Sequence, residues 1–221
     1  REMVGRALGG GAVIGLTTLL KFGIIALGFT AFWGGFWAGL NYAASFVAIH
    51  LLHFTVATKQ PAMTAPAMAA RLQGVDKDDA AVERFVDEVA HLLRSQIAGI
   101  TGNLLAVVPV VVLLQLAAWW AFGHPLVGAH GAEHALETLS LLGLTPLYAA
   151  FTGVLLFASS LIAGWVENSF VWHRLDSAIA WNPTFVALLG GARAKRWAAW
   201  WRANISGLTA NISLGLMLGL V

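Results

Sequence analysis

Residues 50–72 read HLLHFTVATKQPAMTAPAMAARL, and this stretch decides how the chain is organised. An apolar run long enough to span a membrane ends here, and a polar segment with two prolines follows it. Lys59 and Arg71 come soon after the run, and no acidic residue offsets them before Asp76. Basic residues next to a membrane span favour the cytoplasmic side. The stretch therefore predicts a span that ends in the cytoplasm.

The composition is typical of a membrane protein. Hydrophobic residues make up 58% of the chain and charged residues 11%, whereas soluble domains carry about 25% charged residues. The mean hydropathy is +0.75. Helices that face lipid need no polar side. The absence of Cys excludes disulfides, thiolate metal sites and a cysteine nucleophile. We therefore expect an all-α fold, a polytopic transmembrane helical bundle.

Apolar runs of spanning length recur along the chain. A helix rises 1.5 Å per residue, so about 20 residues cross a hydrocarbon core about 30 Å thick. Pro109 predicts a kink in the third run. The chain begins at Arg1 rather than Met, and its last run stops at Val221, so we expect a fragment of a longer polypeptide. The runs predict a single transmembrane domain over residues 1–221 with spans at about 8–29, 36–54, 99–120, 141–165 and 205–221.

Two further helices are expected outside the spans. Residues 79–94 place apolar side chains at helical spacing, with acidic residues at the start and Arg94 at the end, which predicts a cytoplasmic amphipathic helix. Residues 184–204 mix basic side chains with tryptophans, which predicts an interfacial helix on an anionic leaflet. The lipid contacts expected there are Arg193, Lys195, Arg196, Trp197, Trp200, Trp201 and Arg202.

The distribution of charge indicates the orientation. Of the 13 Lys and Arg residues, all except Lys21 precede the first span or lie between the second and third or the fourth and fifth spans. The connections at 30–35 and 123–138 contain no basic residue. This pattern predicts a multi-pass protein of the bacterial inner membrane with a cytoplasmic N-terminus.

Small residues recur at the spacing that allows close contact between helices. The G-x-x-x-G pairs are Gly11 with Gly15, Gly35 with Gly39, and Gly215 with Gly219. Such pairs let two backbones approach, which favours a compact bundle. The alternative is that they only reflect the high glycine content of membrane helices.

Lys21 is the one basic residue inside a predicted span, where a charge is costly. A hairpin turn near residues 31–34 places Lys21 level with Asn41 and Tyr42. These three residues are the candidate polar site within the membrane, for an ion or a substrate. The alternative, which we favour, is a lysine that extends its ammonium group toward the outer interface.

A second candidate site lies in the outer connection. His130, Glu133 and His134 form the order H-x-x-E-H, in which two histidines bind zinc and the glutamate acts as a base. A helix here puts both histidines on one face. The chain offers no convincing third ligand on that side, so we expect at most adventitious metal binding and predict no cofactor.

Histidines also gather near the inner boundary, where His50 and His53 share a predicted helix face and His173 follows the fourth span. Facing histidines on two helices can hold a membrane haem. We prefer hydrogen bonds to the backbone or to lipid headgroups.

Four segments resemble the bacterial membrane-protein family named "site-specific recombinase". The resemblance covers most of the chain but only the membrane-embedded part of the longer family protein. It implies DNA strand exchange, which needs a nucleophile and a basic surface. Tyr42 and Tyr148, the only tyrosines, fall within predicted spans, so nucleic acid is not an expected partner of this region. The segments are LNYAASFVAIHLLHFT (40–55), ATKQPAMTAPAMAARL (57–72), LYAAFTGVLLFASSLIAGWVEN (147–168) and VWHRLDSAIAWNP (171–183).

Three functions compete. The leading hypothesis is a non-enzymatic anchor or interaction scaffold that contacts the lipid bilayer and its anionic lipids, with a homo-oligomer left open. The second is a transporter or channel for ions or small solutes, and the third is DNA recombination, on the family name only. Polar side chains that share a water-filled cavity favour transport, whereas the same side chains used in helix contacts favour a scaffold. The residues that would line a path are Lys21, Asn41, Asn103, Pro109, Gln115 and Asn211.

Overall fold

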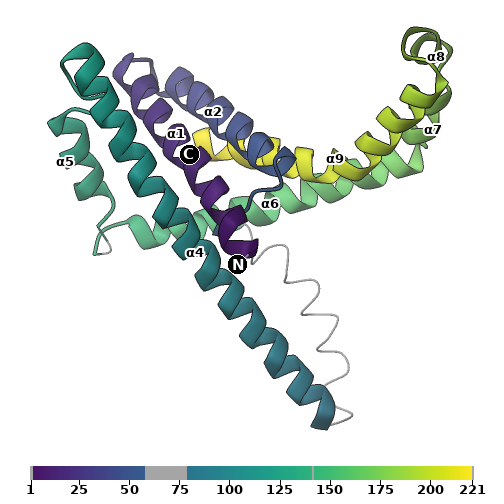
Figure 1. Cartoon of the computed structure of the whole chain (residues 1–221), viewed down its shortest axis with the longest axis horizontal. Coiled ribbons are helices and arrows are strands. Elements are labelled where there is room, and N and C mark those ends of the chain that lie inside the picture. Colours follow the sequence, from purple (N-terminus) through teal and green to yellow (C-terminus); the bar gives the residue numbers. More distant parts are fainter. Residues whose placement is uncertain (1, 58–78, 141, 221) are drawn as a thin grey trace.

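The computed structural model describes residues 2–57, 79–140 and 142–220, and throughout these ranges the regular structure is helical (Figure 1). The predicted all-α class is confirmed. The helices are α1 (Glu2–Ala26), α2 (Ala31–Leu51), α4 (Asp79–Phe122), α5 (Ala129–Thr138), α6 (Thr145–Trp172), α7 (Leu175–Trp181), α8 (Pro183–Leu189) and α9 (Gly191–Leu220).

Four of the described helices are long and apolar enough to cross a membrane, namely α1, α6, α9 and the Phe85–Phe122 part of α4. The predicted span 36–54 corresponds to α2. This helix has 21 residues, which is long enough to cross a membrane, and it includes the polar residues Asn41, Tyr42 and His50, but it is not among the four. It returns antiparallel to α1 through a tight turn, in which Gly28 adopts a φ of +67°.

Two helix boundaries in the structure differ from the predicted ones. The amphipathic helix predicted at 79–94 and the span predicted at 99–120 form one helix, α4, of 44 residues that contains Pro109. The residues between the two predicted segments include no proline, so nothing ends the helix there. The helix predicted at 184–204 is divided instead at Gly190, whose φ of 79° ends α8, and α9 continues unbroken into the fifth span.

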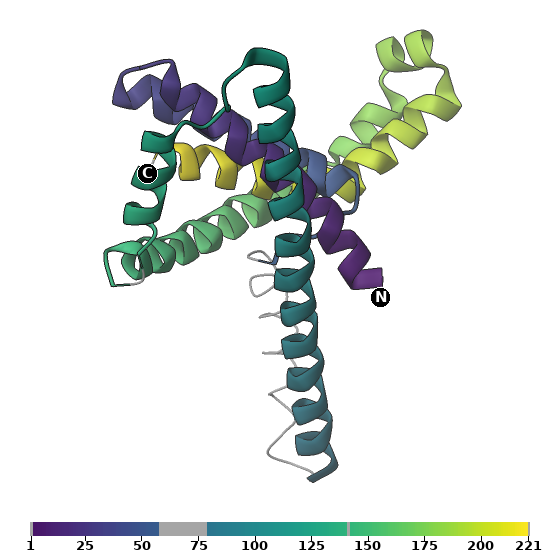
Figure 2. The same ribbon diagram turned by 60° about the vertical axis from the view of Figure 1, so that its left-hand side comes forward.

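The helices pack in pairs that are linked through α2 and α9. Helices α1 and α4 run parallel, since Ala7 meets Gly102 and Gly15 meets Val110, whereas α2 and α9 run antiparallel. Helix α1 lies along α4 and also contacts α2, while α2 and α6 both lie along α9 (Figure 1). Helices α7 and α8 pack against the first part of α9. Figure 2 shows that the first half of α4 projects away from the other helices. The core is therefore two helix pairs, α1 with α4 and α2 with α9, to which α6 is added.

Glycines bring α2 and α9 into backbone contact. A Cβ atom built on Gly35 would lie 2.6 Å from the carbonyl oxygen of Gly219, and one on Gly39 would lie 3.0 Å from that of Leu216. A Cβ on Gly215 would collide with the backbone of Ala43. The prediction that these two G-x-x-x-G pairs mediate close helix contacts is confirmed, and they face each other.

The third pair lies between α1 and α4. A Cβ on Gly11 would meet the backbone of Asn103, and one on Gly15 would lie 3.1 Å from Cγ1 of Val110. On the opposite helix, a Cβ on Gly102 would lie 2.6 Å from the Cβ of Ala7. Close approach through glycine therefore also sets the spacing of α1 and α4.

We expect Gly215→Leu to lower the stability of the protein by about 3 kcal/mol, because the new side chain must push α9 away from the backbone of α2. Thermal unfolding in detergent, followed by far-ultraviolet circular dichroism, measures the effect. Gly153→Leu in α6 is the matched control, since no atom lies within 4 Å of a Cβ at Gly153. Equal melting temperatures for the two variants would contradict the role of the glycine contact.

Candidate functional site

Polar side chains join α1 to α2 at the position where the sequence predicted an intramembrane site. The hydroxyl groups of Thr17 and Ser45 share a hydrogen bond of 2.6 Å, and Thr17 is buried. Nδ2 of Asn41 donates to the carbonyl oxygen of Thr17 at 2.9 Å. The amide of Asn41 is therefore used to hold the two helices together.

Lys21 lies one turn further along α1 and faces an aromatic ring. Its Nζ atom is 5.7 Å from the ring centroid of Tyr42, within the range of a cation–π interaction. The ring of Tyr42 stacks in turn on Phe46, with 6.2 Å between centroids. The structure thus brings Lys21 and Tyr42 together, while Asn41 serves the neighbouring contact with Thr17.

Asn103 in α4 ties together three parts of the chain. Its side chain is only 8% exposed. Nδ2 donates to the carbonyl oxygens of Ala7 at 2.6 Å and Thr55 at 3.1 Å, and Oδ1 accepts from the amide of Ala57 at 2.9 Å. One side chain therefore joins α1 and α4 to the segment that follows α2.

Further hydrogen bonds hold the same segment. The amide of Thr55 donates to the carbonyl oxygen of Arg6 at 3.0 Å, and Nε2 of Gln96 donates to that of Ala57 at 3.1 Å. The chain turns toward these hydrogen-bond partners at His53, whose φ of 55° lies in the left-handed region. Because α2 ends at Leu51, His53 leaves the helix, and the predicted shared helix face of His50 and His53 is not formed.

Gln115 holds the outer end of α4. Its Oε1 accepts from the amides of Leu126 at 2.7 Å and Val127 at 3.2 Å, so it binds the connection that follows the helix. Asn211 in α9 donates from Nδ2 to the carbonyl oxygen of Gly207 at 2.7 Å. Asn41, Asn103, Gln115 and Asn211 thus each bind backbone atoms, and they do so at four separate places in the fold.

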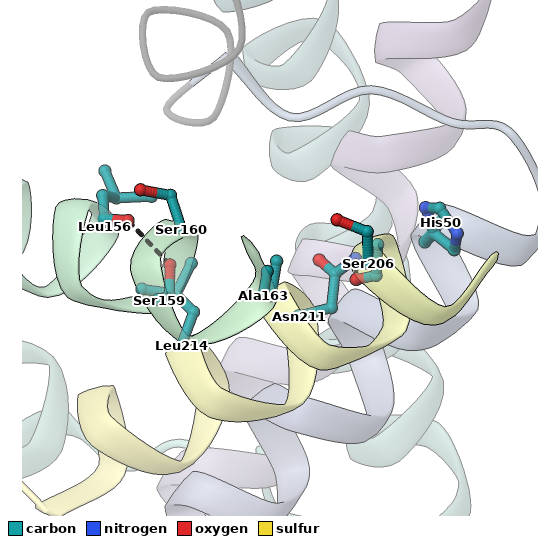
Figure 3. Close-up of a pocket in the computed structure, with 10 residues that line it drawn as sticks. His50, Leu156, Ser159, Ser160, Ala163, Ser206, Asn211 and Leu214 are labelled. Carbon is teal, nitrogen blue, oxygen red and sulfur yellow. Dashed lines mark hydrogen bonds between the residues drawn. The ribbon is translucent and has the colours of Figure 1, made fainter. Parts of the chain in front are cut away.

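A pocket of about 340 Å³ lies between α2, α6 and α9 (Figure 3). Of the six residues proposed for a transport path, Asn211 is the one that lines it. The pocket was not predicted, because its residues come from three distant parts of the sequence. The only indication of the pocket in the sequence is the presence of serine within apolar runs. The lining residues are His50, Leu156, Ser159, Ser160, Ala163, Ser206, Gly207, Ala210, Asn211 and Leu214.

The interfacial lipid contacts predicted near the start of α9 lie on a helix that is packed on one side. Nζ of Lys195 is 4.5 Å from the ring centroid of Trp181 in α7, and Arg202 pairs with Glu167 of α6 at 3.4 Å. The rings of Trp200 and Trp201 meet edge to face at 5.2 Å. The remaining predicted contacts, Arg193, Arg196 and Trp197, are exposed.

The predicted metal site falls on α5 and stays a prediction. Glu133 and His134 are exposed, whereas the side chain of His130 lies outside the part of the chain that the structure describes. Within the described part, no group of three or more His, Asp or Glu side chains is arranged to hold a metal ion. Elsewhere, Nδ1 of His173 lies 2.8 Å from the carbonyl oxygen of Ser169 and binds the end of α6.

Comparison with known proteins gives one family. A family model described as Site-specific recombinase matches residues 1–221. No curated protein and no solved structure matches the chain.

We expect Asn103→Leu to destabilise the protein by about 3 kcal/mol, because it leaves the amide of Ala57 and the carbonyl of Thr55 without their buried partner. Chemical unfolding in detergent measures the loss, and limited proteolysis after residue 52 detects release of the segment. Gln96→Leu removes a single hydrogen bond to the same segment and should cost about 1 kcal/mol. An equal loss in both variants would be evidence against the central role of Asn103.

Proposed function

Since the chain belongs to the site-specific recombinase family and four of its described helices are able to cross a bilayer, we propose that it is a non-enzymatic membrane anchor or interaction scaffold. Its helices hold one another in the bilayer and present their ends, which project from the membrane, to other molecules. The function rests on a fixed arrangement of helices and needs no reaction within these residues.

This proposal rests on the hydrogen bonds that the polar side chains deep in the bundle make. A transport path needs polar groups that face one hydrated cavity, as at the broken helices of transporters. Here Asn41, Asn103 and Gln115 bind backbone groups of neighbouring helices and connections. Each bond satisfies a group that hydrocarbon cannot solvate. This arrangement is expected of side chains that fasten a bundle, and it favours a scaffold over a transporter.

DNA recombination is the activity that the family description implies, and the surroundings of the tyrosines do not favour it here. Tyr42 lies within α2, where its ring contacts Lys21 and Phe46. Tyr148 lies on the first turn of α6 and is 58% exposed, among apolar side chains that are also exposed, such as Leu147 and Phe151. A tyrosine nucleophile needs arginines that bind the scissile phosphate. In the described residues, the hydrogen bonds and ring interactions of the two tyrosines involve no arginine.

The proposed location is the bacterial inner membrane, with the N-terminus in the cytoplasm. The exposed Arg193 and Arg196 then face the anionic lipids of the cytoplasmic leaflet, at about 1 kcal/mol for each basic residue. The arrangement of helix ends agrees with two separate sides of a membrane, and the basic residues indicate which side is cytoplasmic. The α1–α2 turn and α5 lie on the left of Figure 1, whereas α7 and α8 lie far to the right.

Cysteine labelling tests the orientation, because the natural sequence has no Cys. We expect Gly128→Cys to react with a membrane-impermeant maleimide added to spheroplasts, and Ala192→Cys to react only after the membrane is opened. Both positions are exposed in the structure, so differences in labelling report the side of the membrane. The opposite pattern would overturn the proposed orientation.

Lys21→Met separates the scaffold from the transporter. For a scaffold we expect normal assembly, a loss of less than about 1 kcal/mol, since a cation–π contact is all that is removed, and no change in solute flux in proteoliposomes. Lys195→Met is the matched control, because Lys195 also lies over an aromatic ring but close to the start of α9. A Lys21→Met protein that assembles normally and has lost a flux present in the parent and the control would establish the transporter.

A further inference from the structure

The pocket between α2, α6 and α9 has the size and setting of a ligand site within the membrane. Its volume of about 340 Å³ corresponds to about eleven water molecules and reaches the lower range of small-molecule sites. Phe157 and Leu161 of α6 and Ile212 of α9, which belong to the same two helices, are exposed. In a bilayer these side chains face hydrocarbon, so the molecules nearest to the pocket are lipids.

The pocket changes in polarity along its length. Leu156 and Leu214 lie at one end, beside Ser159 and Ser160, whose hydroxyl groups donate to carbonyl oxygens of α6 itself, and Ser206 and His50 lie at the other end (Figure 3). His50 is the residue before the last of α2, so the polar end lies where that helix leaves the membrane. The apolar end lies about 12 Å deeper, because Leu214 follows Ser206 by eight residues of α9. This gradient matches a lipid whose polar part lies at the interface and whose chain extends inward.

The polar end offers one hydrogen-bond acceptor and one hydroxyl group. Nδ2 of Asn204 donates to the carbonyl oxygen of Trp200 at 2.8 Å, which fixes the amide so that its Oδ1 faces Nε2 of His50 at 3.2 Å. Oδ1 is an acceptor, so Nε2 carries the proton and Nδ1 of the neutral ring is left as an acceptor. Within the described part of the chain, neither this Nδ1 nor the hydroxyl of Ser206 has a hydrogen-bond partner.

Glycine at position 207 makes this end of the pocket possible. A Cβ atom there would collide with the imidazole ring of His50. The small side chains of Ala163 and Ala210 leave the rest of the space between α6 and α9 open. The hydroxyl of Ser159 donates to the carbonyl oxygen of Leu156 at 2.8 Å, so it is already bound at the apolar end. The polar groups that still need a hydrogen-bond partner, and that a ligand can therefore bind, are those near His50 and Ser206.

We propose that the pocket binds a glycerolipid that has a free hydroxyl group next to an acyl ester, such as a diacylglycerol. The ester carbonyl accepts from the hydroxyl of Ser206, the free hydroxyl of the lipid donates to Nδ1 of His50, and one acyl chain lies along Leu156 and Leu214. Each unpaired group of the pocket then has a partner, which hydrocarbon alone does not provide.

Photo-crosslinking with the whole chain in nanodiscs tests the site. Diacylglycerol with a diazirine in one acyl chain is compared with phosphatidylcholine that carries the same chain and has no free hydroxyl. Peptide mass spectrometry locates the label. We expect diacylglycerol to label residues 156–163 and 206–214, and phosphatidylcholine to label them at least fivefold less.

Variants link the label to the pocket. Ala210→Phe fills the space and should lower the labelling at least fivefold, whereas Ala203→Phe, at an exposed position of α9 outside the pocket, should leave it unchanged. Ser206→Ala removes one hydroxyl and should lower the labelling about threefold, the effect of one polar contact within a membrane. Ser206→Ala makes the smallest change, so it tests the site even where Ala210→Phe does not fold.

Three results would overturn the proposal. The first is equal labelling by the two lipids, and the second is labelling spread over all the exposed apolar positions and unchanged by Ser206→Ala. The third is labelling of residues 156–163 and 206–214 that a folded Ala210→Phe protein leaves unchanged, which would place the lipid outside the pocket. None of these results bears on the scaffold proposal, which the flux and topology experiments test.

Discussion

The backbone contact between α2 and α9 is the constraint on which the rest of the fold depends. In lipid, apolar surfaces gain little by meeting each other, so helices associate through close packing and polar contacts. Gly39 and Gly215 allow that packing because a Cβ on either would meet the backbone of the other helix. Helix α9 also holds α6, α7 and α8, while α2 is joined to α1 and through it to α4. Both halves of the molecule therefore meet at one glycine-lined contact.

Polar side chains complete the assembly where the backbone is not helical. Hydrocarbon cannot solvate a free amide, so each segment that leaves a helix near the membrane needs partners from the protein. Asn103 supplies them to the segment after α2, and Gln115 supplies them to the connection after α4. Both residues belong to α4, which thus supports the chain at two positions far apart along one helix. Asparagine and glutamine suit this role because each carries a donor and an acceptor without a charge.

The sequence predicts features that depend on local patterns and misses those that depend on distant contacts. Spans, the α1–α2 hairpin and the G-x-x-x-G contacts follow from apolar length and glycine spacing. The continuity of α4 does not, because the change from charged to apolar residues between Arg94 and Gly99 indicates a membrane boundary, and a helix can continue through such a boundary. The left-handed conformation of His53, which takes it off the helix, has no sequence signal comparable to glycine. The pocket unites positions 50, 156–163 and 206–214, whose proximity only the packing of α2 and α6 on α9 creates.

Because α4 is continuous, a tilt about its middle displaces its first turn. Its 44 residues make a rod about 66 Å long, roughly twice the thickness of the hydrocarbon core. If the middle of the bilayer falls near Val107, a tilt of about 10° there carries the first turn of the helix sideways by about 7 Å. Small changes in bilayer thickness or in the packing of α1 are thereby amplified into displacements at the far end of the rod.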